Sequence, residues 1–410
     1  MGCAMLLFSG IAAAEDGLGV ERSLSDMIPD SRLFDAKQQA AKSGVKADVP
    51  ANWAVLPEAG YSPDQGANGG VKFTGRGLTD LDMTLDLEAS AAMQGQRGVD
   101  VTLLTPGFFT RRLVNVEQAH DSYAPTKNFF GLGNNHVGTE PLSTHSVQRQ
   151  RALITFGYWV MPDLIMEVTG GYRNTKIGRG KLENGVGSTL DVFPALPGLE
   201  GGRTNPLSLS FIYNNRESIT RPTKGWSLIG TVEHVNINLA NDFQFTRYVL
   251  DASYLHPMSS GKQVFGLRIG GEIIQGRTRE IPFFELASLG GSDDLRGFFP
   301  DRFLGRSRMM INGEYRIKLL TFSIYSRKVD VDAVLFADMG RVFLSDGEIS
   351  DQFKYHSPKS KFVPLLFSDF RYDGGPGVRF AIGEAILARI DMGFSDEEKG
   401  LVYLVFGHTF

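Results

Sequence analysis

Hydrophobic and polar residues alternate along several segments of this chain. Between residues 81 and 91 the apolar set is Leu81, Met83, Leu85, Leu87, Ala89 and Ala91, and the polar set is Asp82, Thr84, Asp86, Glu88 and Ser90. Successive side chains of a β-strand point to opposite faces, so this segment has one apolar and one polar face. Strands of soluble sheets average about five or six residues. About ten alternating residues, in contrast, are enough to cross a bilayer as a tilted strand.

The pattern recurs and predicts about sixteen strands, an even number, as a closed bacterial membrane barrel requires. The predicted strands cover residues 52–57, 66–74, 82–94, 97–105, 111–118, 150–160, 163–174, 206–215, 226–238, 245–256, 263–273, 309–318, 331–340, 375–384, 386–394 and 400–410. The long connections cover residues 119–149, 175–205, 274–308 and 341–374. We therefore predict an all-β fold, a closed transmembrane antiparallel β-barrel with a polar lumen and both termini in the periplasm.

Composition narrows the class of protein. The 410 residues include 42 Lys+Arg and 46 Asp+Glu, a formal net charge of -4, which excludes a nucleic-acid binder that relies on a basic surface. The single Cys excludes a disulfide framework and a thiolate metal site. The sequence has no apolar run of about 18 residues, so a membrane-spanning helix is not expected.

The beginning of the chain differs from the rest. An apolar run from Ala4 to Ala14 ends in three alanines before Glu15, a pattern typical of a secretory signal and its cleavage site. We therefore expect residues 1–14 to be a signal-peptide remnant, residues 15–51 to be a short periplasmic segment, and residues 52–410 to be the barrel.

Two motifs point to a known family. One connection reads Gly290-Gly291-Ser292-Asp293-Asp294-Leu295-Arg296-Gly297-Phe298, and a later strand contains Phe336-Ala337-Asp338-Met339-Gly340. The first resembles the Arg-Gly-Phe motif in the sixth outer loop of the bacterial surface antigen family, the BamA/TamA-type outer-membrane barrels. The second resembles the Phe-x-Asp-x-Gly motif of the same family. The resemblance implies that the sixth outer loop folds into the lumen.

Three shorter motifs agree with this family in order and spacing. They are Phe130-Gly131-Leu132-Gly133-Asn134, the turn from Asn215 to Trp226, and the terminal Gly407-His408-Thr409-Phe410. Most family members carry periplasmic POTRA domains, and residues 15–51 are too few for one. We therefore expect a barrel-only member without POTRA domains, which a separate periplasmic partner would supply with clients.

The two main motifs predict a contact inside the barrel. Alternation on the strand over residues 331–340 directs Phe336, Asp338 and Gly340 into the lumen. A carboxylate there needs a cation, and an inward loop could bring the guanidinium of Arg296 to Asp338 in a two-pronged hydrogen bond. Gly297 would allow a close backbone approach, and Phe298 would pack against the wall near Phe336. With Leu295, the motif residue before Arg296, these residues form the expected seven-residue contact between loop and lumen.

Other candidate sites are weaker. Phe410 ends the last strand and, by resemblance, would be the signal that the barrel assembly machinery recognises. His120-Asp121-Ser122 has the residue types of a catalytic triad, but neighbours on a strand point to opposite faces, so we interpret it as the start of an outer loop. The acidic residues Glu167, Glu272, Glu314 and Asp332 are typical of a wet lumen. We expect no enzyme activity, no cofactor and no metal site.

The resemblance implies insertion or translocation of protein or lipid at the outer membrane, with outer-membrane lipid as a partner and no nucleic acid. The predicted first strand, from Trp53 to Pro57, is short and ends in proline, so its pairing with the strand over residues 400–410 should be imperfect. An imperfect seam is consistent with a mechanism of lateral opening. The alternatives are a passive solute pore and a structural surface barrel.

Overall fold

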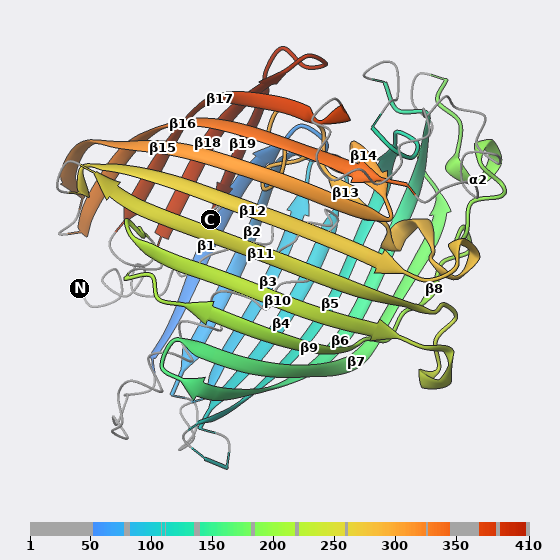
Figure 1. Ribbon diagram of the computed structural model, residues 1–410, viewed down its shortest axis with the longest axis horizontal. Helices are drawn as coiled ribbons and strands as arrows, with labels where there is room; N and C mark the ends of the chain where they lie inside the picture. Colours follow the sequence, from blue (N-terminus) through green and yellow to red (C-terminus); the bar gives the residue numbers. More distant parts are fainter. Residues whose placement is uncertain are drawn as a thin grey trace.

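Sixteen long strands form the wall of a closed antiparallel barrel in the computed structural model (Figure 1). It describes residues 52–406 except 78–82, 108, 111, 135–139, 182–184, 218–220, 259–260, 325–326, 345–368 and 383–385. The expectations for residues 1–14 and 15–51, and for Phe410, lie outside the described residues. The wall strands are β1 (Asn52–Ser62), β2 (Gly66–Arg76), β3 (Thr84–Ala92), β4 (Arg97–Pro106), β5 (Leu113–Phe129), β6 (Ser143–Met161), β7 (Leu164–Arg179), β9 (Leu207–Asn214), β10 (Gly225–Val235), β11 (Phe245–Met258), β12 (Gln263–Gln275), β15 (Ser307–Ile324), β16 (Arg327–Phe343), β17 (Arg371–Ile382), β18 (Ile386–Ser395) and β19 (Leu401–Phe406).

Each wall strand pairs with its neighbour in the chain, and β1 also pairs with β19, which closes the barrel. The predicted all-β barrel of about sixteen strands is therefore confirmed. The remaining elements lie in the connections: α2 (Thr189–Val192), β8 (Gly202–Arg203), η2 (Ile237–Leu239), η4 (Thr278–Glu280), η5 (Phe283–Glu285), β13 (Ala287–Leu289) and β14 (Phe303–Gly305). Among the described residues, no helix is long and apolar enough to cross a membrane.

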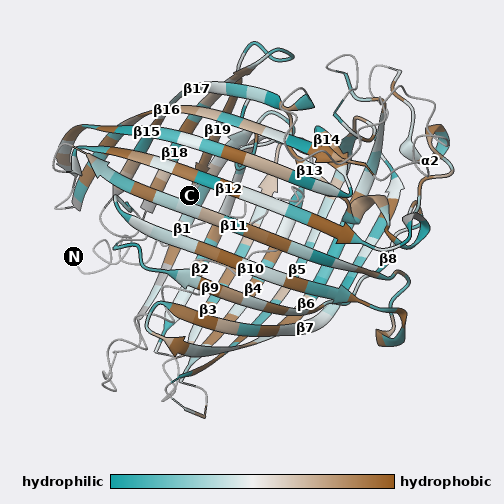
Figure 2. Ribbon diagram, in the orientation of Figure 1, coloured by the Kyte–Doolittle hydropathy of each residue, from teal (hydrophilic) through white to brown (hydrophobic). Residues whose placement is uncertain are grey.

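Apolar and polar residues alternate along the wall strands, as Figure 2 shows. On β3, Leu87 is exposed on the outer face, whereas Glu88 is buried on the inner face. Large apolar side chains are exposed around the wall, among them Leu250 on β11, Ile269 on β12 and Leu335 on β16. Such an apolar surface is stable in contact with hydrocarbon, so the outer face of the barrel faces lipid.

The predicted connection at residues 119–149 is wrong in extent. β5 continues to Phe129 and β6 already begins at Ser143, so much of this segment is strand. Residues of the extension are polar on both faces, for example the buried His120 and the exposed Asp121. The alternation that identifies a lipid-facing strand is therefore absent there, although the backbone pairing continues.

The predicted end of the first strand is also wrong. β1 runs past Pro57 to Ser62 and pairs with β2 at every position. Proline lacks an N–H and is tolerated where one side of a strand is not fully paired. The opposite side of β1 faces β19, where pairing is sparse.

The connections at one end of the barrel, here called the loop end, pack into a small core. α2, β13 and β14 all lie at this end (Figure 1). The core joins strand tips to loop residues: Phe129, Phe193, Leu196, Val235, Phe245, Ile274, Ile281, Phe283, Phe284, Leu286, Ala287 and Leu304. Aromatic edge contacts hold it, with the rings of Phe129 and Phe193 5.2 Å apart. The loops are therefore ordered against one another at this end.

Candidate functional site

The connection between β12 and β15, residues 276–306, folds into the barrel and is here called the inward loop. Its β13 and β14 pair with each other over three positions. Leu295, Arg296 and Phe298 at its tip have no exposed surface. Leu295 and Phe298 pack in an apolar cluster with Met310 on β15 and Val342 on β16. The residues on both sides of the buried Arg296 are therefore fixed by apolar packing.

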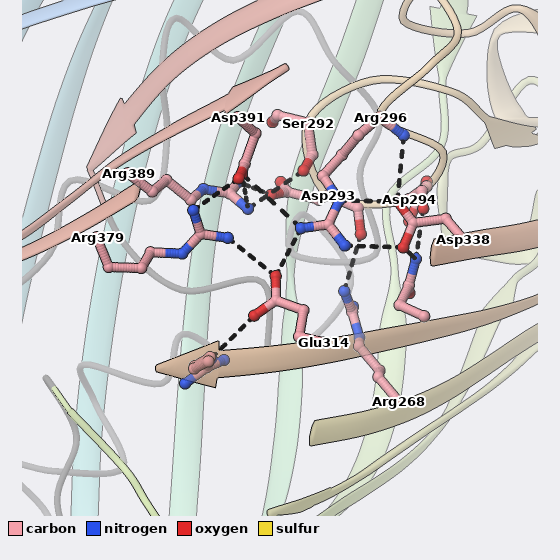
Figure 3. Close-up of polar contacts among 12 residues, drawn as sticks. Arg268, Ser292, Asp293, Asp294, Arg296, Glu314, Asp338, Arg379, Arg389 and Asp391 are labelled. Atoms are coloured by element: carbon pink, nitrogen blue, oxygen red, sulfur yellow. Dashed lines mark hydrogen bonds and ion pairs between the residues drawn. The ribbon is translucent and has the colours of Figure 1, made fainter. Parts of the chain in front are cut away.

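Arg296 is held by two acidic strand residues (Figure 3). Its Nε and Nη2 donate to the two carboxylate oxygens of Asp338 at 2.7 and 2.8 Å, and its Nη1 donates to Glu314 Oε1 at 2.5 Å. The structure thus brings together Arg296 and Asp338, the pair expected from the sequence. We call Arg296, Asp338 and Glu314 the arginine clamp. Burial alone would lower the pKa of Arg296, but Asp338, Glu314 and Asp391 raise that pKa well above its ordinary value.

The clamp belongs to a larger buried network. Glu314 also accepts hydrogen bonds from Arg316 and Arg379, each at 2.9 Å. Arg379 in turn donates to Asp391 at 2.6 Å. Glu314, Arg379 and Asp391 therefore each have a counter-ion in this part of the lumen. The network links β15, β16, β17 and β18 through the tip of one loop.

Small and aromatic residues allow the loop tip to approach the wall. The guanidinium of Arg296 lies over the Phe336 ring at 3.6 Å from the centroid. A Cβ on Gly297 would lie 2.5 Å from the Asp373 Cβ, and one on Gly340 would lie 3.0 Å from a methyl carbon of Leu289. Position 297 therefore requires glycine for the contact to form, whereas at position 340 a side chain would be in tight contact with Leu289.

Phe298 differs in detail from its expected place. It packs edge-on against Phe303 with ring centroids 5.1 Å apart, while Phe336 is used by Arg296. This pairing could not be predicted from the sequence, because Phe303 lies on the returning half of the same loop. The seven expected residues therefore lie around the loop tip, but with a different aromatic pairing.

The upstream acids of the loop are also paired. Asp294 accepts a hydrogen bond from Arg308 Nη1 at 2.8 Å, and Asp293 pairs with Arg389. Burial raises the pKa of Asp294 to about 6, although Arg308 and then Arg268 oppose the shift. The Asp294 carboxyl can therefore gain or lose its proton in mildly acidic solution.

The inward loop also contacts the last strands of the barrel. The Tyr403 hydroxyl on β19 donates to the Phe298 carbonyl at 2.9 Å, and the Ser395 hydroxyl donates to the Gly297 carbonyl at 2.7 Å. A Cβ on Gly393 of β18 would lie 2.1 Å from the Arg296 carbonyl oxygen. The loop tip thus rests directly on β18 and β19.

β19 is joined weakly to β1 on its other side. In the described part of the chain these strands pair at one position, Tyr61 with Leu404. β18 and β19 pair at six positions, and β15 and β16 at seventeen. Among the described residues, the seam between β1 and β19 therefore has the fewest ladder pairs of any junction in the wall.

A second inward arginine comes from the opposite end of the barrel. Arg221, in the connection between β9 and β10, donates through Nε and Nη2 to both carboxylate oxygens of Asp332, each at 2.9 Å. Asp332 lies on β16, the strand that carries Asp338. Sequence reasoning assigned Asp332 to a wet lumen and Arg221 to a turn motif, and it missed their pairing. Arginines from both ends of the barrel therefore hold β16.

The interpretation of His120 as the start of an outer loop is wrong. His120 lies inside β5, and its ring contacts Asp100 on β4 and Ser122 on β5. Asp121 is on the other face and accepts hydrogen bonds from Gln148 and Gln150. Within the described residues, no group of three or more His, Cys, Asp or Glu side chains is placed to hold a metal ion.

Comparisons with known proteins agree with this architecture. The sequence matches the Omp85 superfamily domain over residues 83–410. Among solved structures it resembles BamA from Haemophilus ducreyi lacking POTRA domains 1–3, with 17% identity, a TM-score of 0.63, and coverage of 87% of this chain and 70% of that chain. It also resembles CdiB from Escherichia coli, with 12% identity, a TM-score of 0.57, and coverage of 92% and 71%.

At these identities the solved structures show a shared fold alone. No curated protein matches the sequence significantly. The family match spans most of the chain, including the inward loop, the arginine clamp and the described part of β19. Such a barrel is a protein of the outer membrane. This chain belongs to the Omp85 superfamily.

Proposed function

We propose that the barrel inserts or translocates protein or lipid clients at the outer membrane by opening between β1 and β19. The single observation that carries this proposal is the seam, where one paired position joins the described residues of the two strands. Unpaired backbone groups on a strand edge are a template for a client strand. The fold resembles those of BamA and CdiB.

The inward loop has a defined part in this proposal. It holds β18 and β19 through Gly393, Ser395 and Tyr403, while Arg296 ties its tip to β15 and β16. The last strand is then positioned by the loop instead of by a full ladder with β1. Opening the seam would require β1 to leave, and the loop would keep the edge of β19 in place for a client.

The orientation follows from the same reasoning. An even number of strands puts both termini on one side, and short turns in such barrels face the periplasm. We therefore assign the loop end to the cell surface and both termini to the periplasm. Clients would arrive from a separate periplasmic partner, and the barrel assembly machinery would fold this chain through its terminal Phe410.

A disulfide across the seam tests the proposal. Tyr61→Cys with Leu404→Cys places two cysteines at the one paired position. Cells in which this variant is the sole copy should lose clients from the outer-membrane protein and lipid profiles when oxidised, and recover them when reduced. The matched control is Ile269→Cys with Ile311→Cys, a paired position of the well-paired β12 and β15 junction.

The outcomes are distinct. Unchanged profiles with a fully oxidised seam would contradict lateral opening. A passive pore would instead give a steady large conductance in planar bilayers, insensitive to the seam disulfide. A structural barrel would show neither a loss of clients nor a large steady conductance.

A further inference from the structure

The inner wall carries a serine, a histidine and an aspartate connected in series. His120 Nδ1 lies 2.6 Å from Asp100 Oδ1, and His120 Nε2 lies 2.9 Å from Ser122 Oγ. His120 and Asp100 are directly paired across β4 and β5, and Ser122 is two residues along on the same face. His120 is 8% exposed and Ser122 is 3% exposed. The order of contacts is that of a serine nucleophile, its base and an orienting acid.

With Asp100 ionised and the His120 ring neutral, the donor and the acceptor of each of these hydrogen bonds are determined. An ionised Asp100 can only accept, so Nδ1 of His120 carries the proton that it donates. In the neutral ring Nε2 is then an acceptor, and the hydroxyl of Ser122 donates to it. This is the protonation state in which a histidine can take a proton from a serine.

Positive charge lies next to the hydroxyl. Arg149 is the cross-strand partner of Ser122, and Arg151 is the partner of His120. Arg151 Nη2 lies 3.9 Å from Asp100, and its buried Nε has no hydrogen-bond partner in the structure. The backbone amides of β4, β5 and β6 are used in the sheet, so guanidinium groups are the donors available to stabilise an oxyanion.

A gap adjoins the serine. Gly98 is the partner of Ser122 on β4. A Cβ built on Gly98 would lie 3.8 Å from the Ser122 Cβ and 3.6 Å from the Ser90 hydroxyl, both ordinary contact distances. The glycine therefore leaves a small unfilled space beside the nucleophile.

We propose that Ser122, His120 and Asp100 form a serine hydrolase site on the inner wall, with anionic carboxylic esters as substrates. Ser122 Oγ bonds to the acyl carbon while His120 Nε2 takes its proton. The ester C–O bond breaks, and the alcohol leaves with that proton. Water then attacks the acyl-serine, gives a proton to His120 and releases the carboxylic acid, and the proton returns to Ser122.

The substrate class follows from the surrounding charge. Arg149 and Arg151 would bind an anionic group of the ester and stabilise the negative charge that develops on its carbonyl oxygen. Asp100 acts through His120 and is a positioning residue. This site is independent of the seam, so it goes beyond the proposed transport function.

The first test uses a fluorophosphonate probe, which reacts with activated serines. The folded barrel in detergent should become labelled, and peptide mass spectrometry should place the label on Ser122. His120→Gln should slow labelling by about 10²–10⁴-fold, the range that a general base contributes. Absence of label from Ser122 in the folded wild-type barrel, or an unchanged rate in His120→Gln, would overturn the proposal.

Asp121→Asn is the matched control, because Asp121 is adjacent in sequence but lies on the outer face. Its labelling rate should equal that of the wild type. Asp100→Asn should slow labelling and shift the pH profile of the rate, an effect that a purely structural role would not produce.

The second test uses p-nitrophenyl esters, one neutral and one with a terminal carboxylate. The anionic ester should be hydrolysed faster, and Arg151→Gln should remove that preference. Faster hydrolysis of the neutral ester would overturn the assigned substrate class. Hydrolysis that persists unchanged in Ser122→Ala would overturn the assignment of Ser122 as the nucleophile.

Discussion

Two junctions of the same barrel differ in how they are held. β15 and β16 pair at seventeen positions, and the Arg296 clamp reaches an acid on each strand. β1 and β19 pair at one described position. Both junctions have the same outer environment, so the difference lies in the backbone ladder and in what the inward loop touches. The wall is therefore strong beside the clamp and weak at the seam.

The contrast shows how one loop can serve both junctions. Its tip is anchored by charge at Asp338 and Glu314, and it contacts β19 only through neutral groups such as Tyr403. A buried ion pair is costly to break on one side, whereas a single neutral hydrogen bond contributes about 1 kcal/mol. The loop should therefore stay fixed on β15 and β16 when β1 leaves the seam.

The largest effect is expected from removing the clamp. Arg296→Ala leaves the buried Asp338 without its cation and removes one of the three arginines that contact Glu314. We expect a loss of about 3–5 kcal/mol in the free energy of unfolding. Asp338→Ala should cost a similar amount. Because both remove the same contact, the double variant should be no worse than either single variant.

Urea unfolding in detergent, followed by the gel shift of the unboiled barrel, measures this loss. Arg203→Ala is the control, since the pair of Arg203 and Asp242 is about half exposed and should contribute little to stability. Additive losses from Arg296→Ala and Asp338→Ala would contradict a shared contact. Unchanged protease protection of the inward loop in Arg296→Ala would do the same.

A pH dependence of up to about 3 kcal/mol is expected from Asp294, since each pKa unit corresponds to about 1.4 kcal/mol. Its pKa is raised to about 6 by burial in the docked loop, against about 3.9 in an undocked chain. Between these values the docked loop holds the extra proton, so this contribution favours docking at low pH and is lost as the pH rises through about 6. Protease protection of the loop between pH 4 and 7 measures it, and Asp294→Asn should flatten the profile.

The seam should exchange its amide hydrogens faster than the clamped junction. Among the described residues the seam has one ladder position and the clamped junction has seventeen, so we expect rates on β1 and β19 to exceed those on β15 and β16 by about 100-fold. Hydrogen exchange read by mass spectrometry tests this in lipid nanodiscs. Equal protection of the amides at the two junctions would contradict a weak seam.

The sequence was sufficient for the barrel and for one inward contact. Alternation fixed the lipid-facing set of most strands, and the same alternation turned Asp338 toward the lumen, where the family motif supplied Arg296. These are properties that each strand carries by itself. The extended ends of β5 and β6 were not predictable this way, because polar residues lie on both of their faces.

Contacts that depend on register were beyond the sequence. Asp100 and His120 are paired because the hairpin of β4 and β5 turns at residues 107–112. The sequence predicted the strand after residues 97–105 at residues 111–118. That placement gives the hairpin another register and puts Asp100 opposite a different residue. A shift of two residues changes every partner without changing either face. The pairing of Arg221 with Asp332 was hidden for a related reason, because 111 residues separate them.

The smallest effect should come from Tyr403→Phe, which removes one hydroxyl at the point where the two regions meet. The Phe298 carbonyl loses the hydrogen bond from β19 but keeps its place in the loop, so we expect a cost of about 0.5–1.5 kcal/mol. Because the contact joins the loop to the seam strand, amide exchange should rise on β19 and leave β15 and β16 unchanged. Tyr315→Phe is the matched control, since Tyr315 follows the inward Glu314 and so faces outward on β15. Faster exchange on β15 and β16 in Tyr403→Phe would mean that the clamp and the seam open as one unit, and the contrast between the two junctions would then not describe how the barrel moves.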